Sequence, residues 1–370
     1  MLPLLARLDR WVRRLVVSTI PPALAVWFYS QTRRWFLERL ARAQPERYVP
    51  PPAAGVECWG LRFQTPIFNA AGMFKAGRGY SVAYRQGAGA FLAGTVTLYP
   101  RRGNRKGRIV QPFLSYPRSQ AASNWLGLPN PGYQYVVRQL QQFLSQPGCP
   151  RGISIAPPDE LAFDEAADAL VDGLFLFKNI GIDFVEINES CPNTQTDREA
   201  WDLVWKRLEI VREKFLRKRK RFVPVVVKFS NDVPLSMVAD IVAKLCDLGF
   251  DGVNFGNTST NYSLHRERIH LREQRYYDFF VQNFGGGVSG RPLKEESLLR
   301  CLAAVEYLRE HPPAHEFVVI RTGGILDAED VAESLQRGIH LCQWYTGYFE
   351  QFAQWGHRLY QRIVKHLLSS

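Results

Sequence analysis

The chain has 370 residues, 46% of them hydrophobic and 22% charged, which is an ordinary composition for a globular protein. This length fits either two domains or one large barrel. The six cysteines include no CxxC pair and the seven histidines form no ligand pattern, so the sequence argues for free thiols and against a metal site. A formal net charge of +12 permits an anionic partner, either a membrane surface or a nucleic acid, without choosing between them.

The first 49 residues differ in kind from the rest, because they combine apolar residues at helical spacing with many arginines. Pro21 and Pro22 divide them into two short helical segments, and the apolar run between these segments is too short to span a bilayer. We interpret residues 1–49 as a helical hairpin that lies on an anionic membrane surface. Two alternatives stay open: the helices pack on the body of the protein, or the segment is a mitochondrial presequence.

Residues 50–370 form the second predicted unit, which begins with a linker at Pro50–Ala54 and a small hairpin at Val56–Pro66. Eight short apolar runs follow and predict core strands at Ile67–Ala71, Ala88–Thr97, Gly152–Ala156, Phe184–Asn188, Val223–Phe229, Gly252–Gly256, Phe317–Arg321 and His340–Tyr345. Between most of them lie amphipathic segments that predict helices, namely Phe163–Asn179, Trp201–Lys218, Leu235–Leu248, Glu295–Arg309 and Ala328–Gln336. This alternation predicts an α/β protein with a (β/α)8 TIM barrel, with the Val56–Pro66 hairpin closing its bottom. No GxGxxG motif follows the first strand, which disfavours a doubly wound sheet.

In such a barrel the functional groups lie at the carboxyl ends of the strands. Those ends carry amides, hydroxyls, glycines and two lysines, and they lack the carboxylate pair that glycoside hydrolysis needs. This chemistry suits a flavin, because glycine turns after the last two strands can hold a phosphate and Lys228 can approach the ring atoms N1 and O2. The alternative for Lys228 is a surface salt bridge. The segment Gly285–Leu293 is a further anion cradle or a flexible lid.

The stretch Val185–Thr194 (VEINESCPNT) begins as a buried strand and ends in polar groups. Asn188, Ser190, Cys191 and Asn193 place an amide, a hydroxyl, a thiol and a second amide within six residues. Loops at strand ends often carry function, so we expect reactive groups here, with a plain polar turn as the alternative.

The motifs of the whole body, in their order, resemble those of the dihydroorotate dehydrogenase family. They are NAAGMFK, GTVTLYPRRGN, SNWLGLPNPG, VEINESCPNT, VVVKFSND, GNTST, GGGVSGRPL, TGGI and YTG, and they extend from about Val56 to the C-terminus. The N-terminal hairpin is similar to that of the membrane-associated, quinone-dependent class of this family (class 2). The resemblance implies FMN as cofactor, oxidation of dihydroorotate to orotate, and a quinone as electron acceptor.

Carried over residue by residue, the resemblance implies two sets of contacts. FMN would be held by Ala70, Ala71, Gly72, Thr95, Ser154, Asn188, Lys228, Gly290, Gly324, Tyr345 and Thr346. The substrate would be held by Lys75, Asn124, Asn188, Asn193, Asn257 and Thr258. A planar diamide with a carboxylate needs several amide donors and acceptors and a cation, which this second set provides.

The residue at the position of the catalytic base departs from the quinone-dependent class. That class has serine, the soluble class has cysteine, and this chain has Cys191. We expect Cys191 to act as the general base that removes the C5 proton while a hydride leaves C6, since a thiolate is the better base near neutral pH.

Other positions also depart from the family pattern. Ser154, Gly256 and Arg321 stand where the family usually has asparagine, threonine and glycine, Glu189 is unusual, and Gln111 replaces an arginine common in the quinone tunnel. These changes leave alternatives open: another dihydropyrimidine as substrate, a non-quinone acceptor, or a non-catalytic flavin-binding relative.

The predicted location is the periphery of a membrane, at the cytoplasmic face of a bacterial membrane, with the mitochondrial inner membrane as the alternative. The basic cluster Lys214–Arg221 has no nucleic-acid recognition motif beside it, so we predict no nucleic-acid partner and expect a solvated or membrane-facing patch.

Overall fold

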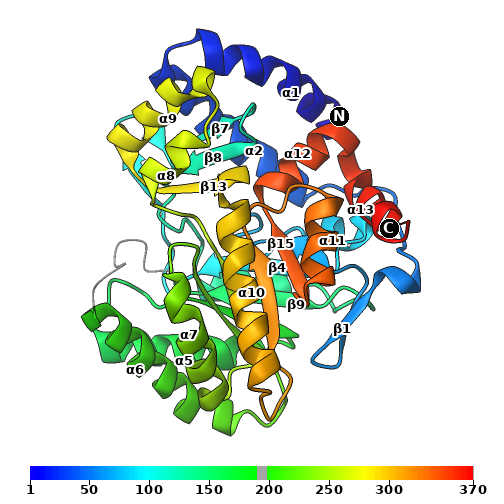
Figure 1. Ribbon diagram of the computed structural model, residues 1–370, viewed down its shortest axis with the longest axis vertical. Coiled ribbons are helices and arrows are strands. Elements are labelled where there is room, and N and C mark those ends of the chain that lie inside the picture. Colours follow the sequence, from blue (N-terminus) through cyan, green and yellow to red (C-terminus); the bar gives the residue numbers. More distant parts are fainter. Residues whose placement is uncertain (190–197, 370) are drawn as a thin grey trace.

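The protein is described by a computed structural model that covers residues 1–189 and 198–369, and its centre is a parallel barrel (Figure 1). Eight strands are hydrogen-bonded in the order β3-β15-β14-β12-β11-β10-β9-β4, and a parallel bridge between Phe74 and Ala93 joins the first strand's extension to the last strand. The predicted (β/α)8 barrel is therefore confirmed. Its strands are β3 Ile67–Asn69, β4 Phe91–Val96, β9 Arg151–Ile155, β10 Phe184–Asn188, β11 Val225–Ser230, β12 Gly252–Asn257, β14 Val318–Thr322 and β15 Leu341–Trp344.

The barrel strands are short runs of β-branched and aromatic residues that are buried on both faces, as in other parallel sheets. Two predicted strands began too early. Ala88 still belongs to the end of the preceding helix, because its N–H donates to Ala83 O. Pro224 has no N–H to donate to a neighbouring strand, so β11 begins at Val225 and not at Val223.

Helices follow most of the strands and cover the outside of the barrel. They are α3 Tyr80–Gln86, α4 Tyr133–Leu140, α5 Phe163–Asn179, α6 Arg198–Lys214, α7 Val238–Leu248, α10 Lys294–Glu310, α11 Ala328–Gln336, α12 Thr346–Trp355 and α13 Leu359–Leu367. Two predicted helices were too long: one ends in a separate 3-10 turn at Leu216–Lys218, and the other begins with a 3-10 turn at Leu235–Met237, directly after Pro234. Four of these helices were not predicted from the sequence, namely α3, α4, α12 and α13.

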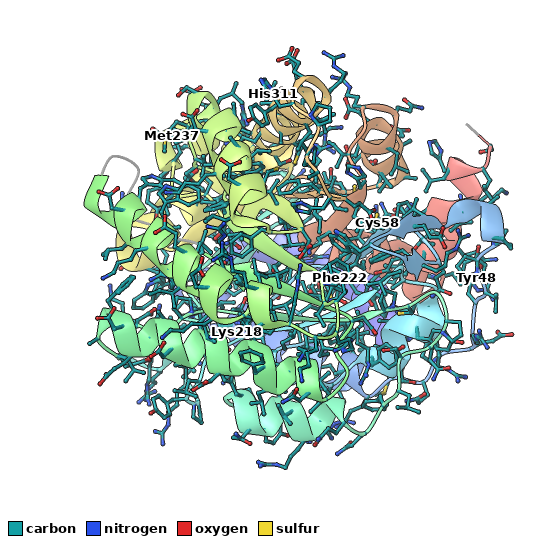
Figure 2. All side chains as sticks on the ribbon, turned by 90° about the horizontal axis from the view of Figure 1, so that it is seen from below. Tyr48, Cys58, Lys218, Phe222, Met237 and His311 are labelled. Carbon is teal, nitrogen blue, oxygen red and sulfur yellow. The ribbon has the colours of Figure 1, made fainter. Side chains whose placement is uncertain are left out.

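The predicted hairpin at the bottom of the barrel is present as β1 Val56–Cys58 and β2 Leu61–Phe63. Phe63 is fully buried and packs against Phe68 and Phe184 inside the barrel, with ring centroids 6.1 and 6.2 Å away. Figure 2 views the molecule from this side, with Cys58 of the hairpin labelled. The amino-terminal end of the barrel is thus filled with aromatic side chains, which leaves chemistry to the opposite end.

A second, smaller sheet lies beside the carboxyl ends of the barrel strands. It contains β7 Phe113–Tyr116, β8 Ala121–Asn124 and β13 Gly287–Gly290, near the short pair β5 Arg105–Lys106 and β6 Ile109–Val110 and the helices α8 Tyr262–Glu267 and α9 Leu271–Phe284. None of these elements was predicted. Because β13 pairs along its length with β8, the expectation of a flexible lid at Gly285–Leu293 is wrong.

The N-terminal hairpin consists of α1 Leu2–Thr19 and α2 Pro22–Ala41 and lies against this smaller sheet and α12 (Figure 1). Its inner face includes Val17 and Val26, which are buried. Its outer face includes Leu8 and Trp11, which are 61% and 76% exposed. One face of the hairpin therefore packs on the body of the protein, as the alternative interpretation predicted. The opposite face is apolar and exposed to solvent. Among the residues described, no helix is long and apolar enough to cross a membrane.

Candidate active site

Side chains at the ends of four barrel strands, β4, β9, β10 and β12, form a hydrogen-bonded row. The hydroxyls of Thr95 on β4 and Ser154 on β9 lie 3.0 Å apart, and Asn188 Nδ2 on β10 donates to Thr95 Oγ1 over 3.2 Å. Asn257 Nδ2 on β12 donates to Asn188 Oδ1 over 2.7 Å. Parallel strands bring their carboxyl ends to one edge of the sheet, which is why residues 162 positions apart in the sequence meet here.

The smaller sheet contributes a third amide, Asn124, near the amides of Asn188 and Asn257. Asn124 Nδ2 on β8 donates to Gly287 O over 3.2 Å, and a Cβ atom at Gly287 would overlap the hydroxyl of Thr258. Asn124 and Thr258 therefore meet across Gly287, directly beside Asn257. The structure thus brings together four of the predicted substrate-binding residues, Asn124, Asn188, Asn257 and Thr258.

Lys228 lies inside the barrel and forms a buried ion pair, so the alternative of a surface salt bridge is wrong. Its Nζ lies 3.6 Å from Glu186 Oε1 and 3.3 Å from Gln343 Oε1, and all three residues are at most 2% exposed. Burial lowers the pKa of Lys228, while the neighbouring Glu186 raises it. Asn254 and Gln343 donate to Glu186 Oε2 over 2.8 and 2.9 Å, which satisfies that carboxylate oxygen.

Lys75, Gly72 and Tyr345 lie together at the junction of β3 and β15. A Cβ atom at Gly72 would lie 3.7 Å from the Tyr345 ring and 4.0 Å from Lys75 Cε. Arg33 of α2 reaches this group from the hairpin, and its Nη1 donates to Tyr345 Oη over 3.1 Å. Burial and the Arg33 guanidinium together hold the pKa of Lys75 well below its usual value.

The glycine turns predicted to hold a phosphate also converge. Ser289 Oγ, beside Gly290, lies 3.0 Å from Thr346 Oγ1, and a Cβ atom at Gly290 would lie 3.0 Å from Thr346 Cγ2. Gly324 has φ +70° and has no space for a side chain, because a Cβ atom would lie 2.2 Å from Lys294 Cα. Ala70 and Ala71 complete this side, with Ala70 N donating to Trp344 O over 2.9 Å.

These residues fit a phosphorylated flavin. The amide and hydroxyl row offers donors and acceptors for a planar diamide edge, and Lys228 is the nearby cation. The crowded glycine turns let the backbone come close to an anion. Cys191 and Asn193 lie outside the described residues, so their predicted roles stay predictions.

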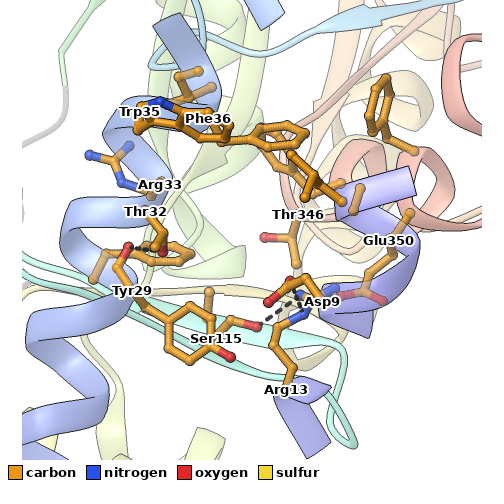
Figure 3. Close-up of a pocket in the computed structure, with 18 of the residues that line it drawn as sticks. Asp9, Arg13, Tyr29, Thr32, Arg33, Trp35, Phe36, Ser115, Thr346 and Glu350 are labelled. Carbon is orange, nitrogen blue, oxygen red and sulfur yellow. Dashed lines mark hydrogen bonds and ion pairs between the residues drawn. The ribbon is translucent and has the colours of Figure 1, made fainter. Parts of the chain in front are cut away.

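An apolar cavity of about 350 Å³ separates the hairpin from the barrel (Figure 3). Its walls come from α1, α2, β7, β8 and α12, and Tyr345, Thr346 and Ala122 border it on the side of the candidate flavin site. Arg33 of α2 lines the cavity, and its Nη2 donates to Gln111 Oε1 over 3.4 Å. Arg33 therefore lies beside Gln111, the residue at the position where the quinone-dependent class commonly has an arginine.

Arg13, Asp9 and Glu350 also line the cavity, and sequence reasoning missed them. Arg13 is one of the many arginines of the first helix, yet it is only 7% exposed. Asp9 is the one acidic residue of α1 and stands four positions before Arg13, a spacing that places both on one face. That pattern was the available signal.

The departures from the family pattern have structural counterparts. A Cβ atom at Gly256 would lie 2.0 Å from Thr322 Cβ, so Thr322 fills the space that a side chain there would take. Arg321 is fully buried and donates to the hydroxyls of Ser297 and Ser334 and to Lys294 O over 2.8 to 3.1 Å.

Ser154 joins the polar row, and Glu189 accepts two 2.7 Å hydrogen bonds from Arg207. In the basic cluster Lys214–Arg221, Arg219 pairs with Asp251 and Arg221 donates to backbone carbonyls, so part of it ties the base of the barrel together.

Comparisons with known proteins show the family and the fold of the chain. A family model described as dihydroorotate dehydrogenase matches residues 53–367. The chain is 29% identical over 305 residues to "Dihydroorotate dehydrogenase (quinone)" of Synechococcus sp., which covers 80% of this chain and 76% of the relative. It is 31% identical over 317 residues to the protein of the same name from Kineococcus radiotolerans, covering 84% and 81%. Its fold is similar to the crystal structure of DHODH from Eimeria tenella in complex with ferulenol, with a TM-score of 0.74, 21% identity, and 92% and 90% of the two chains covered.

Proposed function

Because the chain belongs to the dihydroorotate dehydrogenase family, we propose that it oxidises dihydroorotate to orotate with bound FMN and passes the electrons to a membrane quinone. The observation that carries this proposal is the row Thr95, Ser154, Asn188 and Asn257. Next to Thr95, Gly94 O accepts a hydrogen bond from Gly72 N, and Gly72 lies beside Tyr345, which lines the apolar cavity. A polar site for a small planar substrate and an apolar site for an acceptor thus adjoin each other.

In this proposal FMN, when bound, accepts a hydride from the substrate. Thr95, Ser154 and Lys228 would hold the polar edge of the ring, and the backbone turns at Gly290, Gly324, Tyr345 and Thr346 would hold its phosphate, with Ala70, Ala71 and Gly72 along its side. A lysine at the ring edge favours negative charge there. Its ion pair with Glu186 fixes the position of its ammonium.

The substrate amides are bound by Asn124, Asn188, Asn257, Thr258 and, in the proposal, Asn193. Amide side chains both donate and accept, so each polar edge of the dihydropyrimidine ring finds a complement. Lys75 would bind the substrate carboxylate as a cation. Cys191 would remove the C5 proton as the general base.

The acceptor would enter the cavity beneath the hairpin, which is apolar enough for a quinone ring and borders Tyr345. The exposed Leu4, Leu8, Trp11 and Leu15 lie along one face of α1, and arginines flank them. This face would rest in an anionic membrane surface, so that a lipid-soluble quinone reaches the cavity without crossing water. We propose the cytoplasmic face of a bacterial membrane.

Steady-state assays with different acceptors test this function. Protein loaded with FMN and supplied with dihydroorotate should form orotate when a short-chain quinone is present, and should do so poorly with fumarate or NAD. Orotate formation with NAD or fumarate but not with quinone would refute the acceptor. No orotate with any of the three would refute the reaction.

A further inference from the structure

One end of the cavity carries a compact group of ionisable side chains from the two helices α1 and α12 (Figure 3). Arg13 Nε of α1 lies 2.8 Å from Asp9 Oδ2, and its Nη1 lies 3.2 Å from Glu350 Oε1 of α12. The same Nη1 donates to Ser115 Oγ of β7 over 3.2 Å. Trp35 and Phe36 form the opposite, apolar end.

Tyr29 of α2 lines the same cavity, and its hydroxyl is a buried polar group whose hydrogen bonding is unsatisfied. It is 5% exposed, and its hydroxyl has no hydrogen-bond partner within the part of the chain that the structure describes. A buried hydroxyl without a partner is costly, so a ligand oxygen in the cavity is its natural complement. Burial and the nearby Asp9 raise the pKa of Tyr29, and Arg13 lowers it only in part, so the hydroxyl keeps its proton.

The charges of this group do not balance when both carboxyls are ionised. Arg13 supplies one positive charge against Asp9 and Glu350, which leaves one negative charge in an apolar wall. Burial raises the pKa of Asp9, Arg13 lowers it, and Glu350 raises it again. Together these effects raise the pKa of Asp9, and the Asp9 side chain, with 42% of its surface exposed, can exchange a proton with water.

We propose that Tyr29, Asp9 and Glu350 form a proton-delivery site for the electron acceptor in this cavity, with Arg13 positioning both carboxyls. The inference rests on the proposed function and extends it, since it assigns the residues that protonate the quinone. Tyr29 would donate a hydrogen bond to a carbonyl oxygen of the acceptor, and Asp9 would be the proton donor.

The step balances. A quinone gains two electrons, which the dihydroorotate reaction supplies, and two protons, one on each oxygen. For each proton, the Asp9 O–H bond breaks and a quinol O–H bond forms, and Arg13 holds the resulting carboxylate. Water then reprotonates Asp9 at its exposed side. Overall the substrate loses one proton and one hydride, which together are two protons and two electrons, and the quinone gains the same number of each.

The groups that face Asp9 set its pH dependence. They are Arg13 on its own helix, Glu350 on α12 and Tyr29 on α2, while Arg33 of α2 lines the cavity but is held by Tyr345 and Gln111. The rate of quinone reduction should fall as the pH rises through the pKa of Asp9. Removing the charge of Glu350 lowers that pKa, so Glu350→Gln should move the fall to lower pH.

The test separates acceptors that need protons from those that do not. Enzyme with FMN is reduced anaerobically, with dihydroorotate or with dithionite, and its flavin reoxidation by a short-chain quinone or by ferricyanide is followed by stopped flow. Asp9→Asn and Tyr29→Phe keep the shape of the wall, and Glu38→Gln, which removes an exposed carboxylate of α2 outside the cavity, is the matched control.

We expect Asp9→Asn and Tyr29→Phe to slow reoxidation by quinone at least about tenfold and to leave reoxidation by ferricyanide within about twofold of the parent. Asp9→Asn should also lose the pH dependence, and Glu38→Gln should behave as the parent. The inference would be overturned if Asp9→Asn reduced quinone at the parental rate and with the parental pH profile. It would also be overturned if the variants slowed reoxidation by both acceptors equally, because that result would indicate a purely structural role for these residues. Failure of dihydroorotate to reduce the parent flavin would instead contradict the proposed function, and the dithionite-reduced enzyme would still test the proton delivery.

Discussion

At the scale of single residues, the barrel interior holds a charge pair that the sequence did not reveal. The position of Lys228 at the end of a buried, valine-rich strand predicted that it points into a cavity, but its partner Glu186 lies on another strand, 42 positions earlier. The residue pattern of a single strand does not show which residues lie beside it on the next strand. The ion pair depends on the register between β10 and β11, in which Glu186 lies opposite Val226. The inward direction was therefore predictable, and the ion pair was not.

Glu186→Gln should destabilise the fold, because it leaves the Lys228 ammonium buried without a counter-charge. We expect a loss of about 3–5 kcal/mol in the free energy of unfolding at pH 7, measured by urea denaturation. Loss of Glu186 lowers the pKa of Lys228 further, so part of the stability should return as the pH rises and the amine loses its proton. The double variant Glu186→Gln, Lys228→Met should be more stable than Glu186→Gln alone; the opposite order would show that the pair is not coupled.

Lys75 gives a second expectation at this scale. Its pKa is held well below the usual value by burial and by Arg33, and an anionic carboxylate beside it would raise that pKa. Orotate binding should therefore take up a proton, and its affinity should weaken by up to about tenfold per pH unit above the pKa of the unliganded lysine. Calorimetry in buffers of different ionisation enthalpy measures this uptake. Lys75→Met should abolish the pH dependence and Lys206→Met, an exposed lysine of α6, should not; a proton uptake that survives Lys75→Met would assign it elsewhere.

At the scale of elements, periodicity predicted the N-terminal helices, the eight strands and most outer helices. It failed for the small sheet β7, β8 and β13, whose strands are only four residues long and are rich in serine and glycine. Their sequences show no alternation of polar and apolar residues that would distinguish a strand from a loop. In addition, β13 pairs with β8 only in the folded chain, where Gly287 lies opposite Asn124, 163 positions earlier. The small sheet was therefore not predicted, and Asn124 on β8 was named only because of the family resemblance.

The exposed face of α1 gives a prediction for this element. A double substitution, Leu8→Glu with Trp11→Glu, removes two side chains that are 61% and 76% exposed. It should lower binding to anionic phospholipid vesicles by more than about tenfold, since each large apolar side chain contributes roughly 1.5–3 kcal/mol on burial. Sedimentation with vesicles measures this. Leu144→Glu, at an 80% exposed leucine after α4, is the control. If both variants lost vesicle binding equally, the hairpin would not be the membrane-binding element.

At the scale of the whole molecule, the barrel, the small sheet and the hairpin enclose two sites of different polarity around Tyr345. On one side lie the amides and hydroxyls of the strand ends, and on the other lies the apolar cavity with Arg33 at the border. The sequence could predict the first site because strand ends in a parallel barrel converge by geometry. It could not predict the second, because α1, α2 and α12 meet only in the folded chain.

The central claim is that the polar row binds dihydroorotate beside FMN, and one measurement tests it most directly. Dihydroorotate is titrated anaerobically into the protein loaded with FMN, and the visible absorbance of the flavin is recorded. The account predicts that the absorbance near the flavin maximum is lost in proportion to added substrate, and that Asn188→Ala with Asn257→Ala, which removes two amides of the row, no longer shows this loss at the same concentrations. A flavin spectrum that stays unchanged in the parent protein at saturating dihydroorotate would contradict the account.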